Sequence, residues 1–180
     1  MKNFSFAEFR PTIFFLLRFV GLYVLTNMLY GVYITAYHPK PDPITHTVTV
    51  QTAAVLRATG WNVTTEDHYR QPITNLTFEK QAILAVYEGC SGVNAMLMFL
   101  AFIVAFGPWR KQMLWFIPMG IVVVHLMNLV RISLLFFVSR FLPDAMYFVH
   151  KYLFTAFLYA VIFGLWLIWI RKFTRQTAHA

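Results

Sequence analysis

Long runs almost without charge are the feature that most limits how this chain can fold. They lie at about 12–37, 91–107, 113–133 and 151–170. About 20 apolar residues in a helix cross a bilayer, whose hydrocarbon core is about 30 Å thick. Only 12% of the residues are charged, about half the fraction typical of soluble domains. The sequence therefore predicts an all-α polytopic membrane protein, with about four transmembrane helices in a single membrane domain covering 1–180.

The segment 38–90, between the first and second runs, is too polar to span a membrane. Asp42 followed by Pro43 is typical of a helix start, since aspartate caps the first turn and proline fits the first helical position. Apolar residues then recur at helical spacing, which favours an amphipathic helix over 43–59. The stretch 61–88 is rich in Thr, Val, Tyr and Phe and contains turn residues, which indicates short β strands.

Basic residues indicate how the predicted helices are oriented. Seven of the fifteen basic residues lie at the N-terminus, between the second and third runs or after the last run, and so fall on one side of the membrane: Lys2, Arg10, Arg110, Lys111, Arg171, Lys172 and Arg175. The positive-inside rule makes that side cytoplasmic, so four spans put both termini inside and 38–90 outside the cytoplasm. Six of the seven acidic residues, all but Glu8, fall on the outer side. The net charge of +8 is thus a topology signal, and nucleic acid is not an expected partner.

The only cysteine, Cys90, lies in Glu88-Gly89-Cys90-Ser91-Gly92, where the polar segment meets the second apolar run. A single cysteine excludes an internal disulfide and a cysteine-based zinc cluster. The position predicts a thiol in the first turn of a helix at the membrane surface, where the helix dipole favours the thiolate. A lone cysteine also serves as a small buried apolar residue, so position alone leaves both interpretations open.

Helical rise brings two further polar residues to the level of Cys90. Arg131 lies 18 residues after Met113, which is about 27 Å along a helix and nearly the hydrocarbon thickness. His150 precedes the last run and is expected at the same outer surface. An arginine at a helix end can instead extend to the lipid headgroups, but an arginine within a span is costly and indicates function. Asn128 and His125 are expected to form interhelical hydrogen bonds.

These residues carry a resemblance to a known family. Glu88-Gly89-Cys90-Ser91-Gly92, then Asn128-Leu129-Val130-Arg131-Ile132, then His150 resemble the exosortase/archaeosortase family, over about residues 86–170. Its members are multipass membrane transpeptidases that process exported proteins with a C-terminal sorting signal: a short motif, a transmembrane helix and a basic tail. The chain has fewer spans than typical members, and Phe154 stands where many have glycine.

The resemblance implies that Cys90 is the nucleophile and that Arg131 and His150 complete the site. Cysteine acyl transfer needs a thiolate, a proton donor for the leaving amine and a group that stabilises the oxyanion. A histidine titrates near neutral pH and supplies the proton, and an arginine donates hydrogen bonds as a planar fork. Gly89 and Gly92 would let a substrate backbone approach closely. Glu88 would oppose the thiolate if its carboxylate faced the sulfur.

The family also implies the partners and the location. The expected partners are exported substrates with the sorting signal, membrane lipid, and a lipid or glycan that accepts the acyl group from the Cys90 thioester. No metal or organic cofactor is required by this chemistry. The expected location is the inner membrane of a bacterium, with the site on the outer face.

Two other functional classes fit parts of the sequence. In a non-enzymatic scaffold or assembly subunit, 38–90 would be a docking surface and Cys90 a packing residue. In half of a dimeric transporter, Arg131 would line a pathway. The sequence has neither a pair of spans interrupted by Gly or Pro nor an internal repeat, which argues against the transporter.

Overall fold

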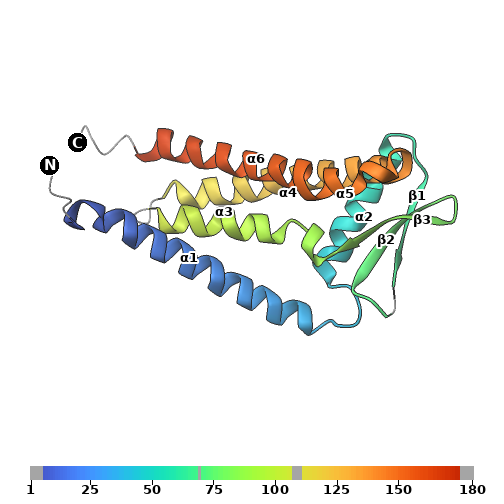
Figure 1. The fold of residues 1–180 in the computed structure, drawn as a ribbon, viewed down its shortest axis with the longest axis horizontal. Coiled ribbons are helices and arrows are strands. Elements are labelled where there is room, and N and C mark those ends of the chain that lie inside the picture. The colour runs from blue at the N-terminus through green and yellow to red at the C-terminus, as the bar shows by residue number, and fades with distance from the viewer. Residues whose placement is uncertain (1–5, 69, 107–110, 175–180) are drawn as a thin grey trace.

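The computed structural model describes residues 6–68, 70–106 and 111–174. Four apolar helices have their axes roughly along the long dimension of the molecule and alternate in chain direction: α1 (Phe6–Thr35), α3 (Val93–Ala105), α4 (Met113–Phe141) and α6 (Phe154–Trp169) (Figure 1). Within the described residues, three helical stretches are long and apolar enough to cross a membrane, namely Phe9–Thr35, Met113–Phe141 and Pro143–Lys172. The predicted polytopic all-α fold is therefore confirmed. Lys2, Arg110 and Arg175, used above for orientation, lie outside the described residues.

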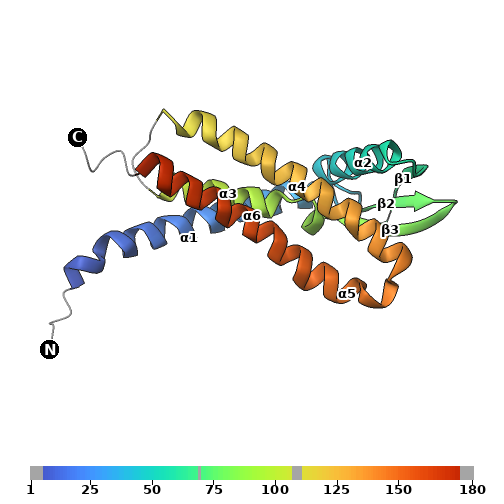
Figure 2. The same cartoon turned by 90° about the horizontal axis from the view of Figure 1, so that it is seen from above.

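Helices α3, α4 and α6 pack against one another, whereas α1 packs along α3. Aromatic rings fill the contacts, and Phe102 of α3 stacks on Trp166 of α6 with ring centroids 4.0 Å apart. Phe19 of α1 meets both rings edge-on. Seen from above, the N-terminal half of α1 lies apart from α4 and α6 (Figure 2). Helices α3, α4 and α6 thus form the bundle, and α1 is attached to one side of it through α3.

Helix α3 has 13 residues, so it rises only about 20 Å and is shorter than the hydrocarbon core of a bilayer. The chain reaches it through a single 3-10 turn, η1 (Glu88–Cys90). Because α3 is short, Cys90 lies beside α4 at Asn128, well before the C-terminal end of α4 at Phe141. Asn128, whose Cα is about 22 Å along α4 from Met113, makes the contact at that level.

The segment between α1 and α3 folds as a small α/β cap on one end of the bundle. Helix α2 (Pro43–Ala58) begins as predicted, with the Asp42 carboxylate accepting hydrogen bonds from the backbone N–H groups of Ile44 and Thr45 at 3.0 and 3.1 Å. Three strands follow, β1 (Val63–Asp67), β2 (Ile73–Phe78) and β3 (Gln81–Tyr87), in an antiparallel meander ordered β1-β2-β3. The predicted amphipathic helix and short strands between the first two apolar helices are confirmed.

A buried apolar cluster ties the cap to the end of α4. It joins residues of α2, the sheet, η1 and α4, namely Val48, Ala53, Leu56, Val63, Leu76, Val86, Cys90, Leu129, Ile132 and Phe136. The turn between β2 and β3 has positive φ at both Glu79 and Lys80, which is the pattern of a tight hairpin. The cap therefore shares a core with the bundle, and the end of β3 is held directly above α4.

The last helical stretch begins earlier than the sequence suggests. The predicted break at 141–144 is present at Leu142 (φ −138°, ψ 57°), but the chain becomes helical again at once with η2 (Pro143–Ala145) and α5 (Met146–Phe148). Proline favours this position because its fixed φ suits a first helical turn. A π-helical turn, η3 (Val149–Leu153), then leads into α6, and a second, η4 (Ile170–Thr174), follows it. His150 therefore lies inside a helix and not ahead of one.

Candidate active site

Cys90 is the last residue of the turn η1 and is buried, with 5% of its surface exposed. Two residues, Ser91 and the N-cap Gly92, separate it from the first residue of α3. The predicted position in the first helical turn is therefore wrong by a few residues. The carbonyl oxygen of Cys90 accepts a hydrogen bond from Asn128 Nδ2 at 3.0 Å. This bond fixes the backbone of the turn against α4.

Gly92 is required by its conformation and by its neighbour. Its φ is +82°, a region that side-chain-bearing residues rarely adopt, and a Cβ there would lie 2.8 Å from Asn128 Cγ. The close approach that the sequence predicts for Gly92 is therefore an approach to Asn128. Because Gly92 has no side chain, its backbone can lie directly against Asn128, the residue that holds the Cys90 carbonyl oxygen.

Replacing Gly92 by alanine should destabilise the protein more than the same change at Gly60. Both glycines have positive φ, which costs about 1–2 kcal/mol for alanine. Only at Gly92 does the new methyl group meet a neighbour, which adds about 1–3 kcal/mol, whereas nothing lies within 4 Å at Gly60. Thermal unfolding of the purified variants in lipid nanodiscs measures the difference. Equal losses for Gly92→Ala and Gly60→Ala would contradict the contact with Asn128.

Arg131 reaches the site from α4, one turn after Asn128. It is 6% exposed, and its Nη1 donates a hydrogen bond to Asn128 Oδ1 at 3.3 Å. Its Nε is buried and has no hydrogen-bond partner among the described residues. Asn128 thus bridges the two residues: its side chain accepts a hydrogen bond from the Arg131 guanidinium and donates one to the Cys90 carbonyl oxygen. The guanidinium keeps donors that Asn128 does not use.

His150 reaches the site from the π-helical turn η3. Its Nε2 lies 3.7 Å from Cys90 Sγ, a distance at which a sulfur forms a weak hydrogen bond. The hydroxyl of Thr155 donates to the His150 carbonyl oxygen at 3.3 Å, within the widened turn. Single π-helical turns occur often at functional sites. The sequence offers no pattern for this turn, so it was not predicted.

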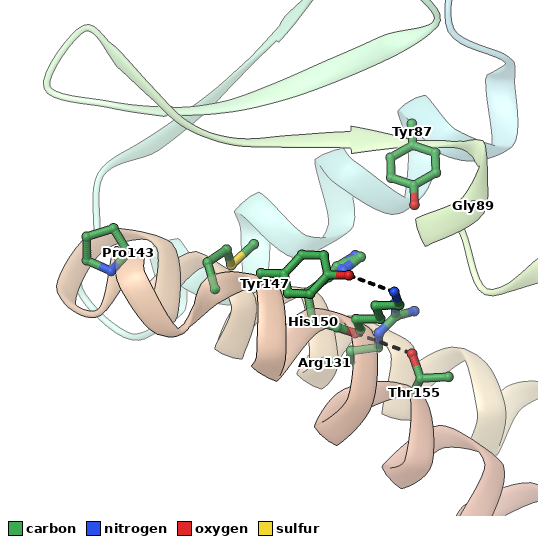
Figure 3. Close-up of a pocket in the computed structure, with 9 residues that line it drawn as sticks. Tyr87, Gly89, Arg131, Pro143, Tyr147, His150 and Thr155 are labelled. Atoms are coloured by element: carbon green, nitrogen blue, oxygen red, sulfur yellow. Dashed lines mark hydrogen bonds between the residues drawn. The ribbon is translucent and has the colours of Figure 1, made fainter.

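Arg131 and His150 line a cavity of about 750 Å³ between the end of β3 and the start of the last helix, and Cys90 lies just behind its lining, next to Gly89. Figure 3 shows Tyr87 and Gly89 on one side, and Arg131, Tyr147, His150 and Thr155 on the other. Pro143, Met146 and Lys151 complete the lining. No acidic residue lines it, and the described residues contain no cluster of His, Cys, Asp or Glu that would hold a metal. Tyr87 and Lys151 were not among the predicted site residues.

The electrostatics of Cys90 differ from the prediction. Burial raises the pKa of its thiol, while the Arg131 guanidinium and hydrogen bonds with Tyr87 act in the opposite direction. The Glu88 carboxylate raises the pKa further, as the smallest of these influences. The expectation of a thiol shifted toward thiolate by a helix N-terminus is therefore wrong. The reason is that Cys90 lies in the turn before α3, within an apolar cluster, where loss of hydration outweighs the nearby positive charge.

Helix α1 touches the turn through one side chain. The hydroxyls of Tyr30 and Ser91 lie 3.1 Å apart, and Ser91 Oγ donates to the Glu88 carbonyl oxygen at 2.7 Å. Tyr30 therefore donates to Ser91 and braces η1 from the side opposite α4. His125, the other polar residue of α4 noted in the sequence, lies away from the cavity and pairs with Gln51 Oε1 of α2 at 2.8 Å.

Comparison with known families identifies the family of this chain. The model of the transmembrane exosortase family matches residues 9–170 of the chain. No curated protein and no solved structure matches it. The matched region contains α1, the cap, and all the helices that line the cavity. The chain therefore belongs to the transmembrane exosortase family, and its role is that of a multi-pass membrane transpeptidase in protein sorting.

Proposed function

We propose that this protein cleaves the C-terminal sorting signal of exported proteins and transfers them to an acceptor through a thioester on Cys90. The observation that supports this best is the approach of Cys90 Sγ to within 3.7 Å of His150 Nε2, beside the buried guanidinium of Arg131. The three side chains come from η1, α4 and η3; Arg131 and His150 line the cavity, and Cys90 adjoins it through His150. Packing alone does not require a cation and an imidazole around a thiol.

In the first step, the Cys90 sulfur attacks the scissile carbonyl carbon while His150 Nε2 takes the thiol proton. This transfer is needed because the raised pKa keeps the buried thiol protonated near neutral pH. A C–S bond forms and the carbonyl electron pair moves onto oxygen. Arg131 donates to that oxyanion from the N–H groups that Asn128 leaves free. Its planar fork suits an oxygen that changes position as the carbon becomes tetrahedral.

In the second step, the oxyanion re-forms the carbonyl and the C–N bond breaks. The protonated His150 gives its proton to the leaving amine, which carries away the sorting signal. The remaining acyl group is a thioester on Cys90. An amine of the acceptor, or water, then attacks this thioester, His150 takes its proton, and the sulfur leaves and recovers a proton from His150. A lipid or glycan that bears the attacking group would complete sorting.

The charge distribution supports an outward-facing site. Arg10 lies near the start of α1, Lys111 just before α4, and Arg171 and Lys172 in η4 after α6, and these helix ends lie together at one end of the bundle (Figure 1). Strand β3 and helix α5, which supply residues that line the cavity, lie toward the other end. By the positive-inside rule, we place both termini in the cytoplasm and the cap and cavity on the outer face of a bacterial inner membrane. Exported proteins arrive at that face with their C-terminal helix still in the membrane.

An acyl-enzyme should accumulate when its resolution is slowed. The enzyme is mixed in membranes with a co-encoded protein that ends in a short motif, an apolar helix and a basic tail. A covalent adduct that hydroxylamine releases is expected, because hydroxylamine cleaves thioesters. A membrane-impermeant thiol reagent added from outside should block the adduct if the site faces outward. Complete processing without an adduct that depends on Cys90 would reject the proposed mechanism and leave the scaffold interpretation.

A further inference from the structure

Tyr87 is placed against the nucleophile by the end of the sheet. It is the last residue of β3 and keeps an extended backbone (φ −123°, ψ 174°), and the chain turns sharply after it into η1. Its side chain lines the same cavity as Arg131 and His150 (Figure 3). The pairing of β3 with β2, which aligns Tyr87 with Ile73, holds the backbone at this point. The position of the ring is therefore tied to the cap and not to the bundle.

Gly89 explains how the ring approaches Cys90. A Cβ at Gly89 would collide with Tyr87 Cε2 and would lie 3.1 Å from Cζ and 3.2 Å from Cδ2. The ring therefore lies directly on the backbone of η1, where only glycine leaves room. The sequence predicts that Gly89 leaves room for a substrate backbone, whereas in the structure it leaves room for the Tyr87 ring. The contact places the edge of the ring on the turn η1, one residue before Cys90.

Cys90 follows Gly89, and the side chains of Tyr87 and Cys90 are close enough to influence each other's ionisation. Tyr87 favours the charged form of the Cys90 sulfur, which is the effect expected of a hydroxyl that donates toward it. The negative charge of Cys90, followed by partial burial, raises the pKa of Tyr87, so the phenol stays protonated and can only donate to a thiolate. The other groups that act on the sulfur are Arg131, Glu88 and His150. Of these, Arg131 and Tyr87 favour the thiolate, and Glu88 opposes it.

We propose that Tyr87 is a further catalytic residue, whose hydroxyl donates a hydrogen bond to the Cys90 thiolate from the side of the cavity opposite His150. Gly89 is the positioning residue that lets the ring reach this place. The inference rests on the proposed function of Cys90 as nucleophile. It adds a second donor to the site, since Arg131 supplies a charge and Tyr87 supplies a directed hydrogen bond without one. No net charge is added to a buried cavity that already holds a guanidinium.

Alkylation of Cys90 tests this without a substrate. Its rate is measured against pH, in nanodiscs, with a small neutral maleimide. Tyr87→Phe keeps the ring but removes the donor, so the midpoint of the profile should move up by about one to two pH units. Gly89→Ala keeps the hydroxyl but displaces the ring, and should also move the midpoint upward. Tyr152→Phe, an exposed tyrosine outside the cavity, should leave the profile unchanged.

The rate at high pH separates ionisation from access. Once every thiol is ionised, wild type and Tyr87→Phe should react at the same rate, because both leave the path to the sulfur open. A Tyr87→Phe profile with an unchanged midpoint, or one changed only in its plateau, would overturn the role of Tyr87. The proposed function is judged separately by the thioester adduct. An adduct with no midpoint shift rejects Tyr87 alone, whereas a shift with no adduct on any substrate rejects the enzyme.

Discussion

Replacing Cys90 by alanine should abolish processing of a substrate that carries the sorting signal, with a loss on the order of 10⁴-fold or more. The thiol is the atom that bonds to the substrate, and no other cysteine is present to replace it. The variant should still fold, because Asn128 holds the carbonyl oxygen of residue 90 and not its side chain. The measurement is the amount of cleaved substrate in membranes that contain equal amounts of wild type or variant.

Cys90→Ser provides the matched comparison. It has nearly the same shape and keeps a hydroxyl near His150, but the alcohol is a much weaker nucleophile without a base tuned to it. We therefore expect Cys90→Ser to be inactive as well, while both variants keep the unfolding temperature of wild type within a few degrees. Processing by a well-folded Cys90→Ala would exclude this residue as the nucleophile. The scaffold interpretation, in which 38–90 is a docking surface, would then be preferred.

Replacing Arg131 by lysine should reduce the rate of processing about 100- to 1,000-fold, the cost typical of losing an oxyanion donor. Lysine keeps the positive charge but not the planar fork. In the structure, one end of the fork donates to Asn128 while Arg131 also lines the cavity. A single ammonium cannot hold Asn128 and reach the oxyanion together. The loss should appear in kcat more than in KM, because the oxyanion exists only in the transition state and the intermediates.

Arg140→Lys is the control for this change. Arg140 lies on the same helix, α4, but its side chain is 39% exposed and forms only a loose ion pair, with Nη2 4.0 Å from Glu79 Oε2. Exposed ion pairs contribute little, so the substitution should leave processing and stability nearly unchanged. Equal, small effects at both positions would mean that Arg131 acts only as an anchor near the membrane surface. That result would remove the oxyanion role while leaving the fold intact.

The fold class could be predicted because its signals are local. A run of apolar residues long enough for a bilayer identifies a spanning helix whatever its neighbours are, and Asp42 with Pro43 starts α2 through bonds within one turn. The strands of the cap were likewise predicted from residue type and turn signals. Helical rise from Met113 also brought Arg131 to the upper part of α4, because distance along a helix depends only on residue count.

The sequence indicated several residues of the candidate site, but not the contacts that position them. Cys90 lies 3.7 Å from His150, Arg131 and His150 line one cavity, and Asn128 joins Cys90 to Arg131. The sequence did not indicate that His150 lies in a π-helical turn, because such a turn depends on packing around it. Tyr87 was missed because the sheet, a long-range structure, brings its ring over Gly89.

The sequence by itself determined that this is a membrane protein and which residue types are available for chemistry, since both depend on residues close together along the chain. Only the tertiary structure decided the ionisation of Cys90. The predicted helix dipole favours a thiolate, but packing of α2, the sheet and α4 around η1 removes water from the sulfur and raises its pKa. Desolvation is summed over all neighbours in space, so no short stretch of sequence contains it.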